Sequence, residues 1–343
     1  MIKQSQETLK IESSLESTDS TGITLKGMPR RTLLRRGLLA GSGMLLAGSA
    51  PHVLAEKSNK GRPGKDTSET APTRYIEAQG TRYAYRRFGN EAGVPILLLQ
   101  HFRGTMDDWD PKVIDGLAKS RPVILFDNAG VGSSGGTVPD NVSDMAHHVA
   151  IFTDGLKLKQ IDLLGFSLGG FIAQQLLLDR ADLYRRAILA GTGPQGGKGM
   201  QSFTPAVAAA ATKYPTDGSE RKFLFFGPSV SSQAAGDDFL QRIRTRTIDR
   251  DPVATVPVMQ GQGKAIGAWG AASNDDYIAR LKEIRVPVLV VNGSDDIMIP
   301  SVNAFDLSQH IPSAQLILYP DAGHGALFQY AELFVAHANL FLS

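Results

Sequence analysis

A serine in a glycine-rich turn is the strongest candidate for chemistry in this chain of 343 residues. Ser167 lies in Gly165-Phe166-Ser167-Leu168-Gly169-Gly170, which is a G-x-S-x-G motif. An apolar run at 161–164 precedes the motif and a helix-like run at 171–177 follows it, so the serine lies between a strand and a helix. A sharp turn there exposes the serine oxygen, and the glycines remove Cβ atoms that would clash. The pattern predicts a nucleophilic serine.

With this motif in this context, the sequence resembles the α/β-hydrolase family. The resemblance covers about 75–343. The family places its catalytic residues in the order serine, acid, histidine. A neutral serine is a weak nucleophile that needs an adjacent base, itself oriented by a third group. The two partners are therefore expected downstream of Ser167.

The acid is expected in the segment after the apolar run 286–291, which reads Asn292-Gly293-Ser294-Asp295-Asp296-Ile297-Met298-Ile299-Pro300. The family often shows G-x-x-D-x-x-x-P at this place. The resemblance implies that Asp296 is the triad acid, because it lies three residues after Gly293 and four before Pro300. Its neighbour Asp295 is interpreted as a solvated turn residue.

The histidine is expected after the last apolar run, 314–319, in Pro320-Asp321-Ala322-Gly323-His324-Gly325. A histidine in a glycine-flanked loop at this place corresponds to the family's catalytic histidine, so the resemblance implies that His324 is the base. His147 and His148 lie in a helix-like stretch without a further ligand, and we interpret them as packed or solvated.

Acyl transfer also needs donors for the developing oxyanion. The resemblance implies that these are the backbone N–H groups of Leu168 and Phe102. The family commonly has His-Gly-x-x-Gly followed by Trp in the second loop. Here Gln100-His101-Phe102-Arg103-Gly104 and Trp109 occupy that place, so a side chain replaces the usual glycine. His101 and Arg103 are interpreted either as lining the mouth of a pocket or as packing within the loop.

A second glycine motif, Gly130-Val131-Gly132-Ser133-Ser134-Gly135, fits the G-x-G-x-x-G pattern of dinucleotide sites. Such a site needs a helix to begin within the motif, and Gly136-Thr137-Val138-Pro139 opposes one. The family often shows D-x-R-G-x-G-x-S here, which Asp127 to Ser134 match with Ala129 in place of Arg. No cofactor and no metal is expected.

Short apolar runs alternate with helix-like stretches along the body of the chain. Runs without polar alternation favour strands buried on both faces, as in a parallel sheet. Two alternating runs around Gly80 indicate an antiparallel hairpin. The expected strands are 74–78, 81–87, 94–99, 122–126, 161–164, 187–190, 286–291 and 314–319, and the expected helices are 141–156, 168–180, 301–309 and 325–341. This alternation predicts an α/β fold with a mainly parallel sheet. The resemblance implies the α/β-hydrolase fold: a mainly parallel eight-stranded sheet with helices on both faces and a helical cap insertion.

The predicted core comprises 75–193 and 286–343, and the predicted helical cap comprises 194–285, with helices at 203–214, 239–248 and 276–284. Large apolar side chains in the cap either line an acyl pocket or pack in its core; they are Phe223, Phe225, Phe226, Met259 and Trp269. Arg242, Arg244, Arg246 and Arg250 favour a solvated face over an anion clamp.

The N-terminal region has the features of an export signal. Arg30-Arg31 and Arg35-Arg36 precede an uncharged stretch at 37–50, which is too short for a membrane span of ~20 residues. The paired arginines resemble a twin-arginine leader. We predict a signal peptide at 1–55 with a cleavage site after Val53-Leu54-Ala55, and a flexible linker at 56–74. The protein is then periplasmic or secreted; the alternative is a membrane anchor formed by an uncleaved leader.

Composition excludes several classes of function. Cysteine is absent, which excludes disulfides, thiolate metal sites, a cysteine nucleophile and lipid attachment through cysteine. The net charge of +2 comes from the leader: 1–55 hold seven Lys and Arg against four Asp and Glu, so the remainder carries −1. The body therefore lacks the basic footprint of a nucleic-acid-binding protein.

The resemblance implies a cofactor-free serine hydrolase that acts on small carboxylic esters through an acyl-enzyme. Alternatives with the same triad are perhydrolase or haloperoxidase chemistry, lactone hydrolysis and carbon–carbon bond hydrolysis. Dehalogenases and epoxide hydrolases normally carry Asp as nucleophile, which Ser167 argues against. A rival of another class is a non-catalytic binding protein on this scaffold, and a nicotinamide oxidoreductase is a weaker one.

Overall fold

The structure is a computed structural model that describes residues 66–273 and 275–343. The predicted leader at 1–55 and the first part of the predicted linker lie outside the described residues. The described elements, in chain order, are β1 (Arg74–Ala78), β2 (Thr81–Gly89), β3 (Ile96–Leu99), the short 3₁₀ helix η1 (Met106–Asp108), α1 (Pro111–Ala118), β4 (Pro122–Phe126), α2 (Val142–Gly155), β5 (Ile161–Phe166), α3 (Leu168–Asp179), β6 (Tyr184–Ala190), α4 (Pro205–Thr212), α5 (Ser219–Phe225), α6 (Val230–Arg242), α7 (Val256–Ala271), α8 (Asp275–Leu281), β7 (Val288–Gly293), α9 (Val302–His310), β8 (Ala314–Tyr319), α10 (Ala326–Gln329) and α11 (Ala331–Phe341).

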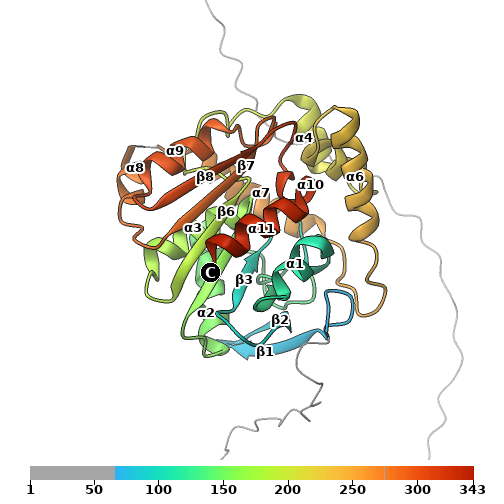
Figure 1. Ribbon diagram of the computed structural model, residues 1–343, viewed down its shortest axis with the longest axis vertical. Coiled ribbons are helices and arrows are strands. Elements are labelled where there is room, and N and C mark those ends of the chain that lie inside the picture. Colours follow the sequence, from blue (N-terminus) through green and yellow to red (C-terminus); the bar gives the residue numbers. More distant parts are fainter. Residues whose placement is uncertain (1–65, 274) are drawn as a thin grey trace, which may run out of the picture. The chain divides into compact units, whose positions relative to one another are not determined.

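The strands form one eight-stranded sheet in the order β1-β2-β4-β3-β5-β6-β7-β8. Strand β2 runs antiparallel to both β1 and β4, and every other neighbouring pair is parallel. Figure 1 shows the sheet with the C-terminal strands at one edge and the hairpin β1-β2 at the other. The predicted mainly parallel eight-stranded sheet, the hairpin and the strands are confirmed.

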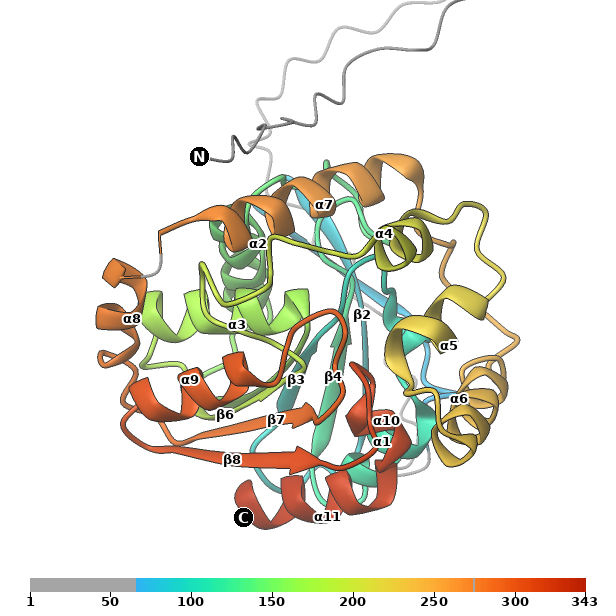
Figure 2. The same cartoon turned by 90° about the horizontal axis from the view of Figure 1, so that it is seen from above.

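Both faces of the sheet are covered by helices, as a parallel sheet requires. Alternate residues of β3 and β5 enter different cores: Leu97 and Leu163 pack with α2, α3 and α9, whereas Leu98 and Leu164 pack with α1, α10 and α11. Figure 2 shows α2 and α3 on one side of the sheet and α1 and α11 on the other. This double burial explains why the strands read as unbroken apolar runs in the sequence.

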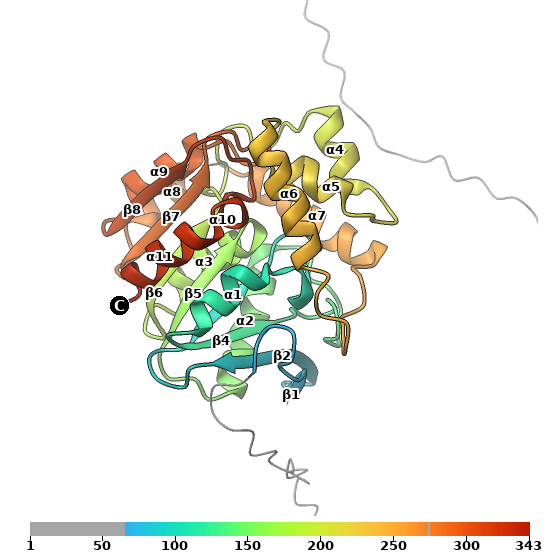
Figure 3. The ribbon, with the colours of Figure 1, turned by 45° about the vertical axis from the view of Figure 1, so that its right-hand side comes forward.

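Helices α4 to α8 lie between β6 and β7, in the interval that the sequence analysis predicts to be a helical insertion. Figure 3 shows α4, α5 and α6 beside one another. The helix expected at 239–248 is wrong in position, because α6 occupies Val230–Arg242. Its N-cap is Ser229, whose side chain accepts from the N–H of Ser232. That 194–285 form a separate cap domain stays a prediction.

The segment 66–73 belongs to the folded body, so the predicted flexible linker is wrong over this stretch. Ser68 donates from its N–H and its Oγ to the two carboxylate oxygens of Asp115 at 2.7 and 2.8 Å. Ala71 is fully buried. Polar sequences with little apolar area can still be ordered when their backbone groups are satisfied by the surface they cross.

No helix in the described part of the chain is long and apolar enough to cross a membrane.

Candidate active site

Ser167 occupies a strained turn between β5 and α3. Its backbone has φ 57° and ψ −118°, which is unusual for a residue with a side chain. The turn is tight enough that a Cβ on Gly165 would lie 2.3 Å from the carbonyl oxygen of Gly169. A Cβ on Gly169 would lie 2.0 Å from the carbonyl oxygen of Leu99. The motif's glycines are therefore required by the close approach of three backbone segments, as the sequence predicts.

Asp296 and His324 form a buried pair at the carboxyl ends of β7 and β8. Asp296 Oδ2 lies 2.8 Å from His324 Nδ1. The other oxygen, Oδ1, accepts from the N–H groups of Met298 and Ile299 at 2.8 and 2.9 Å. With Nδ1–H donating to the carboxylate, the Nε2 lone pair of a neutral His324 is free to accept a proton. The neighbouring Asp295 is exposed and accepts from Ser294 Oγ.

The glycines around His324 allow a helix of the insertion to pack against its loop. Gly325 N–H donates to the carbonyl of Phe225 in α5 at 2.8 Å. A Cβ on Gly325 would lie 2.7 Å from the Cβ of Phe225, and one on Gly293 would lie 2.1 Å from the carbonyl oxygen of Ala322. Close approach of β7, the histidine loop and α5 therefore holds the Asp296–His324 pair in place.

Phe102 and Leu168 lie on neighbouring loops, because β3 and β5 pair in parallel. Leu168 is the first residue of α3, so its N–H has no acceptor within the helix. The Gln100 side chain organises the Phe102 loop: Oε1 accepts from the N–H of His101 at 2.9 Å and Nε2 donates to the carbonyl of Thr105 at 3.0 Å. The Gln100 side chain thus links two parts of a loop in which the family usually has a His-Gly pair.

A cavity of about 140 Å³ brings the candidate residues together. Ser167, His324 and Phe102 line it, with side chains from η1, α4 and α5 opposite them. A second, smaller cavity of about 30 Å³ is lined by Leu168 and mostly apolar neighbours, among them Val131, Met145 and Ile172. His101 borders both cavities. Of the two interpretations of His101 and Arg103, lining the pocket is confirmed, since both line the larger cavity.

His101 is a buried imidazole that stays neutral at ordinary pH. It is 4% exposed and packs edge-on against the rings of Phe166 and Phe225. Burial lowers its pKa to about 4, with Asp108 opposing the shift. Its Nδ1 donates to the carbonyl of Phe102 at 2.8 Å, so Nε2 carries the lone pair.

Comparison with known proteins identifies the family. The family model described as "alpha/beta hydrolase fold" matches residues 94–330, more than half of the chain. The chain belongs to the α/β-hydrolase family. An α/β-hydrolase fold protein from Chitinophaga pinensis is 42% identical, covers 81% of this chain and 99% of its own, and has a TM-score of 0.76.

Two named relatives of this hydrolase share less of its sequence. A putative non-heme bromoperoxidase of Mycobacterium tuberculosis is 24% identical over 71% of this chain and 91% of its own. A 2-hydroxy-6-oxo-6-phenylhexa-2,4-dienoate hydrolase of Burkholderia cepacia is 28% identical over 62% of this chain and 73% of its own. Membership of the family makes the protein a hydrolase that acts on small molecules.

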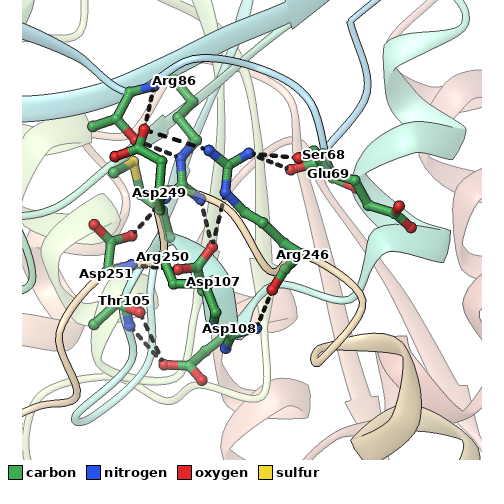
Figure 4. Close-up of polar contacts among 12 residues, drawn as sticks. Ser68, Glu69, Arg86, Thr105, Asp107, Asp108, Arg246, Asp249, Arg250 and Asp251 are labelled. Carbon is green, nitrogen blue, oxygen red and sulfur yellow. Dashed lines mark hydrogen bonds and ion pairs between the residues drawn. The ribbon is translucent and has the colours of Figure 1, made fainter.

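A buried ionic network joins the insertion of this hydrolase to its core, and residue types alone did not reveal it (Figure 4). Arg86 of β2 is 1% exposed and contacts Asp107 at 2.6 Å and Asp251 at 3.1 Å. The N–H of Asp251 donates to Asp107 at 2.6 Å. From the insertion, Arg246 donates to the carbonyls of Ser68 and Glu69.

This network contradicts the prediction of a solvated face for Arg242 and Arg246, whereas Arg244 and Arg250 are exposed, as predicted. Arg242 pairs at 2.6 Å with the fully buried carboxylate of Asp110, and Arg246 is 7% exposed. Arg250 lines the cavity, and Arg244 donates to the carbonyl of Asp217 near the surface. A run of arginines at helical spacing is easily interpreted as a solvent-exposed face, because the sequence does not show that their acidic partners lie far away in the chain.

The second glycine motif packs around a buried carboxylate of the protein itself, that of Asp127. Asp127 accepts from the N–H groups of Met106 and Ser133, and a Cβ on Gly132 would lie 2.1 Å from its Oδ2. Helix α2 begins only at Val142, outside the motif. Burial, and then the charge of Asp251, raises the pKa of Asp127. The glycine at 132 is explained by this buried acid.

The five large apolar side chains predicted in the insertion differ in their surroundings, and Met259 is half-buried outside the cavity lining. Phe225 lines the cavity. Phe226 packs against Phe239, Trp269 stacks on Phe171 of α3, and Phe223 is 43% exposed.

His148 accepts from or donates to the hydroxyl of Tyr83 at 2.6 Å, as expected of a packed residue. Among the described residues no group of three or more His, Asp or Glu is placed to hold a metal ion.

Proposed function

We propose that this protein is a serine hydrolase that cleaves small carboxylic esters through an acyl-enzyme. The observation that carries the proposal is the Asp296–His324 hydrogen bond of 2.8 Å in a loop beside the cavity that Ser167 also lines. Ser167 is the nucleophile, His324 the base and Asp296 the group that orients and stabilises the imidazolium.

The proposed reaction follows from this arrangement. His324 Nε2 takes the proton of Ser167 as its oxygen attacks the ester carbonyl. The N–H groups of Phe102 and Leu168 stabilise the oxyanion, each donor contributing about 3–4 kcal/mol. His324 then returns the proton to the leaving alcohol. Water, deprotonated by the same histidine, attacks the acyl-enzyme and releases the acid.

The test is mass spectrometry of the purified protein after treatment with a fluorophosphonate. We expect one adduct, located on Ser167 by peptide digestion, and no adduct on Ser167→Ala. A folded protein that takes no label from this reagent or from a smaller organophosphate would overturn the proposal. The favoured reading would then be a binding protein on a hydrolase scaffold.

Perhydrolysis is a second candidate, favoured by the similarity to a putative bromoperoxidase. The same acyl-enzyme reacts with hydrogen peroxide instead of water and releases a peracid. Carbon–carbon bond hydrolysis is suggested in the same way by the similarity to a 2-hydroxy-6-oxo-6-phenylhexa-2,4-dienoate hydrolase. Detection of peracetate from acetate and peroxide supports perhydrolysis, and its absence in a sample that labels at Ser167 excludes it.

We also propose that the protein is exported by the twin-arginine route. Arg30-Arg31 followed by the uncharged stretch at 37–50 supports this. The hydrolase would then act in the periplasm or outside the cell.

A further inference from the structure

Three buried polar atoms beside Ser167 have no hydrogen-bond partner among the described residues. They are His101 Nε2, Arg103 Nη2 and Glu220 Oε1. All three side chains line the larger cavity, and each residue is no more than 6% exposed. A buried polar group without a partner is unfavourable, so three such atoms on side chains that line one cavity call for an explanation. A ligand that bonds to them in the cavity supplies one.

The donor among them is held firmly in place. Arg103 Nη1 donates to the carbonyls of Ala211 and Lys213 at 2.9 and 3.0 Å. The backbone N–H of Arg103 donates to Gln262 at 2.6 Å, in the left-handed region with φ 63°. These bonds join the oxyanion loop to α4 and α7 and fix the guanidinium, so Nη2 presents a donor at a defined place.

The anionic acceptor among them is the carboxylate of Glu220 at the start of α5. Its Oε2 accepts from the N–H groups of Gly218 and Asp217 at 3.0 and 3.4 Å, which leaves Oε1 unpaired. Burial lowers the pKa of Arg103, and the charge of Glu220 is the largest influence that opposes the shift. The two charges therefore act on each other, yet neither unpaired atom bonds to the other.

Of the other charged side chains in the cavity lining, Arg221 and Asp251 have partners of opposite charge, whereas Arg250 is exposed. Arg221 contacts Asp108 at 2.8 Å, and Asp251 is held by Arg86. Arg250 donates to the carbonyls of Ile243 and Arg246. Among the buried charged side chains of the cavity, what remains for a ligand is one cationic donor, Arg103 Nη2, and one anionic acceptor, Glu220 Oε1. A carboxylate would be repelled by Glu220 and an ammonium by Arg103, whereas an amide both accepts and donates without charge.

We propose that the larger cavity binds an uncharged carboxamide or carbamoyl group on the alcohol half of the substrate. Its carbonyl oxygen accepts from Arg103 Nη2 and its N–H donates to Glu220 Oε1. His101 Nε2 is a further acceptor, which favours a primary amide. The acyl half lies in the smaller apolar cavity beside Leu168, which has space for a short chain. The inference rests on the proposed function, since it names the substrate of the same serine.

Four acetate esters of nearly equal shape test the proposal in the wild-type protein. They are 3-acetoxypropanamide, the ketone 4-acetoxybutan-2-one, the carboxylate 3-acetoxypropanoate and the hydrocarbon 3-methylbutyl acetate. Acid release is followed by titration at constant pH. Only the amide can accept from Arg103 Nη2 and also donate to Glu220 Oε1. We therefore expect its kcat/KM to exceed that of each of the other three esters by about tenfold or more.

The variant Glu220→Gln replaces the carboxylate acceptor by an amide that can present a hydrogen-bond donor to the cavity. Gln can keep an oxygen for the N–H of Gly218 and turn its NH₂ group to the cavity, so it offers a donor and no charge. We expect kcat/KM for the amide to fall about tenfold and that for the carboxylate to rise about tenfold. The matched control is Glu283→Gln, an exposed glutamate after α8, which should leave all four values unchanged.

The outcomes separate this inference from the proposed function. Equal kcat/KM for the amide and the hydrocarbon, in a protein that labels at Ser167, overturns the subsite and leaves the hydrolase intact. If no ester is hydrolysed and no label is taken, the hydrolase proposal fails. The subsite is then decided by ligand-observed NMR on Ser167→Ala: saturable binding of 3-acetoxypropanamide but not of 3-methylbutyl acetate supports it, and equal or absent binding refutes it.

Discussion

At the scale of single residues, the bond between Asp296 and His324 is the contact whose loss is easiest to interpret. Its two partners come from different strand ends, and the acid has a neighbour of the same type that is exposed. The two adjacent aspartates thus form a natural experiment, since only one of them reaches the histidine.

We expect Asp296→Asn to lower kcat for 4-nitrophenyl acetate by about 10⁴-fold with little change in KM. An amide at this position favours the tautomer in which His324 Nε2 carries the proton and cannot accept one from Ser167. Steady-state kinetics measure the effect. Asp295→Asn should keep wild-type rates, and equal losses in the two variants would remove Asp296 from the proposed triad.

His101 makes the folded protein sensitive to acid. A pKa lowered to about 4 means that the unfolded chain binds the proton first, so stability present above pH 6.5 is lost as pH falls toward 4. The loss amounts to about 3 kcal/mol at pH 4.

The variant His101→Asn keeps a donor for the carbonyl of Phe102 and does not titrate. Urea denaturation at pH 7 and pH 4 should therefore show a drop in the free energy of unfolding that is smaller in the variant than in wild type. Carboxylates titrate equally in both proteins and cancel from the comparison. Identical drops would mean that His101 is protonated in the fold without penalty.

At the scale of elements, the Arg86 network ties β2 to the segment between α6 and α7. The guanidinium neutralises Asp107 from the core and Asp251 from the insertion (Figure 4). Breaking such a buried group by removing one partner leaves uncompensated charges behind.

We expect Arg86→Met to lower the free energy of unfolding by about 3–5 kcal/mol, measured by urea denaturation at pH 7. The matched control is Arg87→Met on the other face of the same strand. Arg87 pairs with Glu91 near the surface, so its loss should cost under about 1 kcal/mol. Similar costs for the two variants would show that the buried network does not hold the insertion.

Elements with a strong local pattern were predictable, and those formed by long-range packing were not. The strands were found because burial on both faces demands apolar side chains at every position. Helix α7 was missed, because Val256–Ala271 contains Gly261, Gly263, Gly267 and Gly270, which are poor helix formers. The close contact of Gly270 with Met200 shows what its missing side chain permits.

At the scale of the whole molecule, the proposed twin-arginine leader would decide where the hydrolase acts. We expect the exported protein to begin near Glu56, as read by N-terminal sequencing of the periplasmic or secreted fraction. Replacing Arg30 and Arg31 with Lys should retain the precursor in the cytoplasm. A mature protein that begins upstream of Arg30 would contradict the leader.

The sequence by itself determined the fold class and the three residues of the proposed triad. Strand-forming runs, glycine turns and motif spacing are local properties, and Ser167, Asp296 and His324 each follow a strand end that local pattern reveals. The roles of Arg103, Glu220 and Arg86 were decided only by the tertiary structure. Whether a charge is solvated, paired or left open to a ligand depends on groups far away in the chain, such as the carbonyl of Ser68, which lies 178 residues from Arg246. Burial and pairing arise when the whole chain packs, and no local pattern records them.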